Sequence, residues 1–511
     1  MPGIRPFKLR VLWIPIVLLQ AVTVLAQSST QAEALHAVNR ISFGPAPGEV
    51  ARVMQIGVDH YIEEQLNPER LALPAQLSQQ LDSLTTTRLS QDDLINQYRE
   101  AQRAARADSE AGKEQRREMV QNLTLQAGEA RLMRALQSPR QLEEVMVDFW
   151  FNHFNVFSGK GLDRVLVESY EREAIRPHAM GRFRDLLGAT ARHPAMLFYL
   201  DNWLSVAPGY RPPYRTPALV KTGGLNENYA RELMELHTLG VDGGYNQTDV
   251  TELARMLTGW TINPRRGSGG SVFYFDGSRH DTGTKNWLGR TVGDRGQAEG
   301  EWALDLLAAA PATAHHISYQ LAQYFVSDTP PVALVDRLAR RFQETGGDIR
   351  SVLRTLFTSP EFRDPNVYNL KFKTPYRYLL SSVRASGLPV TNVRPLLATA
   401  NQLGMPLYGC QTPDGYKNTE EAWLNPDAIT RRVNFAVAFA SGKLPLERPM
   451  ESNADIGVRY NPQGTSEPVD AAALLTTLDG SISPATLTAI EQSDPRLRAA
   501  LVLGSPDFMR Y

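Results

Sequence analysis

Hydrophobic positions recur at helical spacing along most of the chain. After about residue 30, apolar side chains return every three to four positions, the period of an α-helix with one buried face. Residues 87–135 are rich in Gln, Arg, Glu and Ala with few helix breakers, which predicts long, exposed polar helices. We therefore expect a mainly α fold: a large multi-helix globular body with an extended polar helical arm.

One region of the chain, residues 261–290, has strand character instead. Val272–Phe275 is β-prone, and Asp276 and Gly277 form a turn signal. Trp287–Gly289 suits the returning partner strand. This pattern predicts a small β-hairpin insertion in the helical body.

The first 26 residues have the pattern of a secretory signal peptide. Arg5, Lys8 and Arg10 precede an apolar run that ends in small residues at Ala26. The run is too short for a stable membrane span, and it contains Pro15. We expect cleavage near Ala26 and a secreted or periplasmic protein.

The mature chain reads as one body. Residues 27–450 are expected to form a helical core domain that includes the arm at 87–135 and the insertion at 261–290. Residues 451–469 are polar, with Gly, Pro, Asn and Ser, and predict a loop. Residues 470–511 predict C-terminal helices that pack on the core.

Composition excludes several classes of function. The net charge is −1, so nothing favours nucleic-acid binding. The lone cysteine, Cys410, leaves no intrachain disulfide. The sequence has no CxxCH motif of covalent haem, no nucleotide-binding loop, no zinc motif and no GxSxG.

Polar residues are concentrated between Gly223 and Trp260, where the pattern predicts two short helices separated by a glycine-rich turn. A helix turns by about 100° per residue, which places Asn228, Arg231, Glu232 and Glu235 on one face. Spacing favours an Arg231–Glu235 ion pair and an Asn228–Glu232 contact. His237 falls on the apolar side. The face is typical of either a solvated helix or a ligand site.

Other polar groups are candidates for the same site. Asn152 and His153 lie in an aromatic-rich helix, and His280 and Asp281 lie in the loop of the predicted hairpin. Asp249 also fits a helix N-cap, with Glu252 completing the cap. The candidate ligand-binding residues are Asn152, His153, Asn228, Asp249, Trp260 and Asp281.

Several blocks of sequence carry a resemblance to a known family. They are NRISFGPAPGEV, VDFWFNHFNVFSGKG, GLNENYARELMELHTLGVDGGYNQTDVTELARMLTGWTI, FYFDGSRHDTGTKNWLG, GMPLYGCQTPDGY and AWLNPDAITRRVNFA. In order and content they resemble the bacterial family called domain of unknown function 1800, over nearly all of the mature chain. The resemblance implies an exported, mostly helical protein with a sulfatase-like partner encoded nearby. It implies no reaction, substrate or cofactor.

Two function classes remain open. In the first, the protein is a secreted or periplasmic hydrolase-like enzyme. Glu232 and Glu235 supply carboxylates, His237 or His280 supplies a base or ligand, and Arg231 holds an anionic group. The histidines lack zinc spacing, so a metal in such a site would be an oxygen-ligated divalent cation such as calcium or magnesium. In the second, the protein is a non-catalytic helical scaffold that acts with the exported sulfatase-like partner.

Overall fold

The computed structural model describes residues 30–511 except 107–109, 212–223, 264–271, 448–464 and 479. The predicted signal peptide and most of the predicted loop at 451–469 lie outside these residues. Within them the chain is mainly α with two small antiparallel two-stranded sheets, as the sequence predicts. None of the described helices is both long and apolar enough to cross a bilayer.

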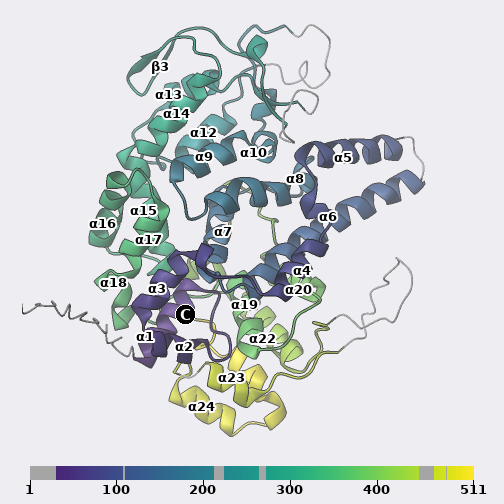
Figure 1. Cartoon of the computed structure of the whole chain (residues 1–511), viewed down its shortest axis with the longest axis vertical. Coiled ribbons are helices and arrows are strands. Elements are labelled where there is room, and N and C mark those ends of the chain that lie inside the picture. The colour runs from purple at the N-terminus through teal and green to yellow at the C-terminus, as the bar shows by residue number, and fades with distance from the viewer. Residues whose placement is uncertain (1–29, 107–109, 212–223, 264–271, 448–464, 479) are drawn as a thin grey trace, which may run out of the picture.

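The first part of the chain runs from short N-terminal helices through a long helical hairpin to a central helix, α7 (Figure 1). The bounds are α1 Gln31–Ile41, α2 Glu49–Ile56, α3 Val58–Leu66, α4 Ala75–Ser83, α5 Gln91–Arg106, α6 Glu110–Gln137, α7 Gln141–His153, α8 Asp163–Ser169, α9 Phe183–Arg192 and α10 Pro194–Tyr199.

The predicted polar arm consists of α5 and α6, which pack on each other and project from the right of the body in Figure 1. The arm is less exposed than its composition suggests. α6 is polar and exposed over most of its first half, whereas most of its residues from Ala127 to Ala135 are buried. The C-terminal part of α6 therefore belongs to the core.

The strand region forms two hairpins, not one. β1 Trp260–Ile262 pairs with β2 Phe273–Phe275, and β3 Lys285–Trp287 pairs with β4 Arg290–Val292. The prediction that Val272–Phe275 pairs with Trp287–Gly289 is therefore wrong. Leu288 and Gly289 have φ of 48° and 73°, the left-handed pair that closes a two-residue hairpin turn. This local turn makes β4 the pairing strand of β3.

The rest of the chain adds helices at the top, on the left and at the bottom of Figure 1. The bounds are α12 Asn228–Glu235, α13 Gln247–Met256, α14 Ala298–Ala309, α15 Pro311–Phe325, α16 Val332–Glu344, α17 Ile349–Phe357, α18 Pro360–Arg363, α19 Pro375–Ser386, α20 Arg394–Gln402, α21 Glu420–Trp423, α22 Pro426–Ala440, α23 Ala471–Thr477, α24 Pro484–Glu491 and α25 Arg498–Gly504.

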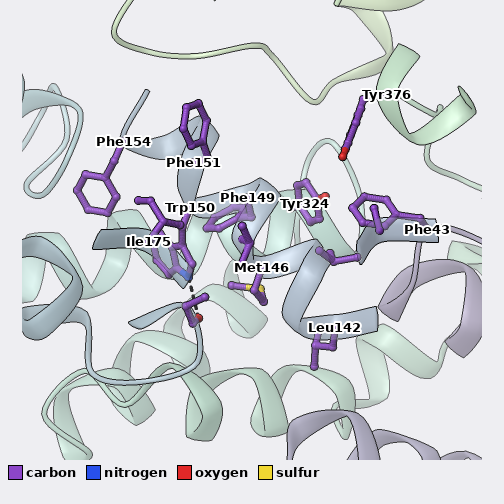
Figure 2. Packing of buried hydrophobic residues seen from close by; sticks show 14 of the residues in the cluster. Phe43, Leu142, Met146, Phe149, Trp150, Phe151, Phe154, Ile175, Tyr324 and Tyr376 are labelled. Carbon is purple, nitrogen blue, oxygen red and sulfur yellow. Dashed lines mark hydrogen bonds between the residues drawn. The ribbon is translucent and has the colours of Figure 1, made fainter. Parts of the chain in front are cut away.

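Helix α7 is buried on nearly every side because its sequence is apolar nearly all round. Figure 2 shows its aromatic side chains packed among residues from distant segments. The rings of Phe149 and Tyr324 meet edge-on with centroids 5.3 Å apart. Trp150 is fully buried and donates from its indole nitrogen to the Ala179 carbonyl at 3.0 Å. This packing fixes the residues that α7 presents at its C-terminal end.

Candidate active site

A polar cavity of about 260 Å³ opens where α7, α15 and α19 meet the end of α12 and residues 405–418. We call it the cleft. Its polar and aromatic lining comes from segments far apart in sequence: Asp148, Phe149, Asn152, His153, Glu235, His316, Gln320, Gln323, Tyr324, Thr374, Arg377, Asp414, Tyr416, Lys417, Asn418 and Tyr511.

Three of the residues singled out from the sequence, Asn152, His153 and Glu235, line this cleft. Asn152 donates to the Tyr416 carbonyl at 2.8 Å and accepts from the Tyr416 N–H at 2.7 Å. The amide side chain therefore holds the 405–418 segment against α7 through the same pair of hydrogen bonds that a paired backbone would make. His153 is the last residue of α7 and is buried.

Two histidines bind the C-terminal end of α12. Nε2 of His153 lies 3.2 Å from the His237 carbonyl, and Nε2 of His316 lies 3.3 Å from the Leu236 carbonyl. Carbonyl groups at a helix C-terminus have no partner within the helix, so N–H groups from α7 and α15 stabilise them. The histidines thereby fix the position of Glu235.

All three of these histidine rings are expected to be neutral at neutral pH. Burial lowers the pKa of His153 to about 3, with a further contribution from His316. Burial also lowers the pKa of His237 well below its ordinary value, and that of His316 in the same direction. His237 is 1 % exposed and does not line the cleft. The cluster suits hydrogen bonding, and it carries no positive charge to hold an anion.

The carboxyl groups of α12 differ from one another. Glu232 and Glu235 lie one helical turn apart, and both are half-buried. Burial raises the pKa of Glu232, and the negative charges of Glu235 and Asp414 raise it further. The Tyr245 hydroxyl lies 3.5 Å from the Glu235 carboxylate, and the pKa of Tyr245 is raised to about 12 by burial and by that charge. Glu235 lines the cleft, and Glu232, with its raised pKa, lies one turn away outside the cavity lining.

The predicted pairing on α12 is wrong. Arg231 lies 3.6 Å from Glu227, one turn earlier, and donates to Gln247 at 2.8 Å. The arginine thus points toward the start of the helix and toward α13, away from Glu235. Asn228 is the exposed first residue of α12. Neither Arg231 nor Asn228 lines the cleft.

His280 and Asp281 lie in a separate cluster, where they bind Arg255 of α13 and Glu299 of α14; α13, β3 and α14 are at the top of Figure 1. Nδ1 of His280 lies 2.9 Å from the Thr258 carbonyl, and Nε2 lies 3.3 Å from Glu299. Asp281 pairs with Arg255 at 2.8 Å. This second cluster does not share the cleft with Glu235.

Asp249 and Glu252 bind the hairpin formed by β3 and β4. Their carboxylates accept the backbone N–H groups of Leu288 and Asn286 at 2.8 and 2.9 Å. Asp249 is also not the N-cap of α13: Asn246 is the cap, and Asp249 is the third helical residue of the capping box. Both acids face the hairpin because they lie one turn apart on α13.

Trp260 is fully buried, and its ring meets Phe273 edge-on at 5.3 Å. Its indole therefore packs inside the molecule between β1 and β2, away from the cleft.

One group of described residues has metal-ligand spacing. Side-chain atoms of His280, Asp294 and Glu299 lie within 4.8 Å of one another. The carboxylate of Glu299 already has a cation, because the ammonium of Lys285 lies 2.7 Å from it and both side chains are fully buried. The set does not include Glu232, Glu235 or His237.

Local spacing could not have identified Arg377, His316 or Asp414 as neighbours of Glu235. They lie on α19, α15 and the 405–418 segment, and the fold alone brings them together. The available sequence signal was the tripeptide NHF of α7, where adjacent polar residues interrupt an aromatic run. That signal located one wall of the cleft.

The chain was compared with known proteins. A family model described as "Protein of unknown function (DUF1800)" matches residues 36–510. No curated protein and no solved structure matches the chain.

Proposed function

The chain belongs to the family described as protein of unknown function DUF1800, and we propose that the cleft is the active site of an exported hydrolase. The observation that carries this proposal is a pair of carboxyl groups one turn apart on α12. Glu235 lines the cavity, and burial raises the pKa of Glu232, which lies just outside the cavity lining. A carboxyl group with a raised pKa beside a second carboxyl group is an arrangement that general acid and base catalysis uses.

The roles follow from the two environments. Glu235, which lines the cavity, takes a proton from the attacking water. Glu232, whose pKa is raised by burial, gives its proton to the leaving group. His153 and His316 are positioning residues, because they hold the end of α12 through its carbonyl groups.

Export is part of the proposal and rests on the basic start and apolar run that end at Ala26. The test is N-terminal sequencing of the protein recovered from the periplasm or the culture medium. We expect the mature chain to begin at Gln27. Protein that stays in the cytoplasm with an intact N-terminus would contradict export.

Hydrolysis is tested with a panel of chromogenic esters, glycosides, phosphates, sulfates and anilides, each with added calcium or magnesium and with EDTA. Glu235→Gln should abolish any turnover found, and Glu232→Gln should slow it and move the acidic limb of the pH profile. The control is Glu344→Gln, at an exposed residue of α16. Full activity in Glu235→Gln would remove the cleft as the active site.

A second candidate function is a scaffold that binds the exported sulfatase-like partner. An apolar groove of about 580 Å³ between α22, α24 and α25 favours it. Val433, Val437, Leu497 and Leu501 in this groove are each between 41 and 50 % exposed. If the scaffold role holds, Val437→Asp should abolish co-purification with the partner, whereas Glu235→Gln should leave it intact.

A further inference from the structure

Arg377 on the first turn of α19 places a guanidinium in the floor of the cleft. The residue is 3 % exposed and lines the cavity. Its Nη1 donates to the carbonyls of Asn39 at 2.8 Å and Ser42 at 2.6 Å, which hold the group in place. Its Nη2 is buried and has no hydrogen bond of normal geometry to any described residue. Burial lowers the pKa of Arg377, but the Tyr511 and Tyr324 hydroxyls act on the guanidinium and raise that pKa overall. One edge of the guanidinium is therefore held by carbonyl groups, and the other edge lacks such a partner.

The charge of Arg377 has no direct counter-ion in the part of the chain that the structure describes. Two acids that line the cleft have other ion-pair partners: Asp148, whose charge acts on Arg377 at longer range, binds Arg131 at 2.5 Å, and Asp414 binds Lys417 at 2.7 Å. An arginine stays protonated in proteins. The floor of the cleft therefore carries a fixed positive charge.

A second buried arginine, Arg40, adds positive charge near the floor of the cleft. The guanidinium carbons of Arg40 and Arg377 lie 4.8 and 4.3 Å from the centroid of the Tyr511 ring. Arg40 is fully buried and donates from Nη2 to the Val367 carbonyl at 2.6 Å. Two buried cations near one ring repel each other and are costly unless an anion balances them.

The N-terminus of α19 points to the same place. This helix has 12 residues, and its N-cap, Thr374, lines the cleft. The Thr374 hydroxyl oxygen accepts from the Arg377 N–H at 3.3 Å, which leaves its own proton to donate. Helix N-termini attract anions through their dipole and their N–H groups.

We propose that Arg377, Thr374 and Lys417 form an oxyanion subsite that holds a carboxylate, sulfate or phosphate group of the substrate. The assignment rests on the proposed function for its link to a reaction, because Glu235 lines the same cavity. The free edge of a guanidinium matches two oxygens of such a group. It replaces Arg231, the anion-holding residue that the sequence suggested, since that side chain is engaged with Glu227 and Gln247.

The subsite is tested by isothermal titration calorimetry of the mature protein with inorganic phosphate, inorganic sulfate, glucuronate and glucose at matched ionic strength. We expect one site per chain for the anions and none for glucose. If glucuronate binds more tightly than the inorganic ions, the site holds an anionic group of a larger substrate. If the inorganic ions bind more tightly, the ligand is a free oxyanion.

Variants distinguish anion binding at the subsite from a non-specific effect of the protein's overall charge. Arg377→Lys should abolish binding, but it also disturbs the Asn39 and Ser42 carbonyls, so a second variant is needed. Lys417→Glu, at an exposed rim residue, should weaken binding about fivefold, which corresponds to roughly 1 kcal/mol of charge interaction across solvent. Arg340→Glu, at an exposed residue of α16, makes the same charge change outside the cleft and should leave affinity unchanged.

The outcomes distinguish the two proposals. Anion binding that is lost in Arg377→Lys and weakened in Lys417→Glu supports the subsite even if no hydrolysis is found. Hydrolysis lost in Glu235→Gln without any anion binding supports the enzyme and overturns the subsite. Anion binding that is equal in wild type, Lys417→Glu and Arg340→Glu is adventitious and also overturns it.

Discussion

Replacing Lys285 with methionine tests whether the second polar cluster holds the fold together. The Lys285 ammonium lies 2.7 Å from the Glu299 carboxylate, and both side chains are 0 % exposed. Glu299 also faces His280 at 3.3 Å and accepts the Arg295 N–H at 3.0 Å. Methionine keeps the length and apolar stem of lysine but removes the charge, leaving a buried carboxylate short of its counter-ion.

The expected loss is large because the pair is fully enclosed. Removing one partner of a buried ion pair costs about 3–5 kcal/mol, since the remaining charge stays buried. Exposed pairs contribute far less, roughly 0.2–0.5 kcal/mol for neighbours on one helix. Lys113→Met is the matched control, because Lys113 pairs with Glu110 at 3.0 Å with side chains 45 and 90 % exposed.

The loss should also depend on pH, through His280. Burial lowers the pKa of His280, but hydrogen bonds to Glu299 and to the Thr258 carbonyl outweigh it, so the pKa is raised above 6.5. Protonated His280 therefore stabilises the fold fully below pH 6.5, and this contribution disappears as pH rises through the folded pKa. In Lys285→Met the imidazolium can partly replace the ammonium at pH 6 but not at pH 9.

The assay is urea unfolding followed by tryptophan fluorescence at pH 6 and pH 9. Trp287 and Trp302 lie beside the cluster, with ring centroids 6.0 Å apart, and report its opening. We expect Lys285→Met to lose more stability at pH 9 than at pH 6, and Glu299→Gln added to it to recover part of the loss. A loss no larger than that of Lys113→Met at both pH values would refute the reasoning.

Three further changes have defined outcomes. Asp163 has two buried carboxyl oxygens without a hydrogen bond to described residues, and burial raises its pKa well above 3.8. Ionised Asp163 therefore destabilises the fold more as pH rises. The free energy of unfolding of Asp163→Asn should exceed that of wild type by roughly 1–3 kcal/mol at pH 8 and should equal it near pH 4. Glu171→Gln removes a charged hydrogen bond to buried Arg131 at 3.0 Å, while Asp148 remains as the counter-ion of that arginine, and urea unfolding should show a loss of about 1.5–3 kcal/mol. Gly289→Ala should cost about 1–2 kcal/mol in the same assay because φ is 73°, whereas Gly293→Ala, which likewise meets no neighbouring atom, should cost far less.

Much of the secondary structure could be predicted from short-range pattern. The polar segment near 226–256 does form two short helices, α12 and α13, separated by a glycine-rich turn, because helix periodicity and glycine placement act over a few residues. The predicted ion pair was wrong where one arginine had two carboxylates within reach. Arg231 could reach Glu227 or Glu235, and its contact with Gln247 on α13 decided for Glu227.

The candidate site shows the same division. Sequence spacing identified Glu232 and Glu235 as neighbours, since residues three apart on a helix share a face. It could not separate them from His280, which is engaged with Glu299 in another cluster. It also could not find Arg377, whose position in the cleft depends on α19 packing against the C-terminal end of α1.

The sequence by itself determined the mainly α fold and the family, because these depend on side-chain periodicity and on residue order. Only the tertiary structure decided which polar groups meet. His153, Glu235, His316 and Arg377 lie on four separate helices, and the packing of the aromatic helix α7 against its neighbours brings them to one cavity. Burial then sets their charge: desolvation keeps the histidines neutral, raises the pKa of Glu232 and leaves the guanidinium as the fixed positive charge of the cleft.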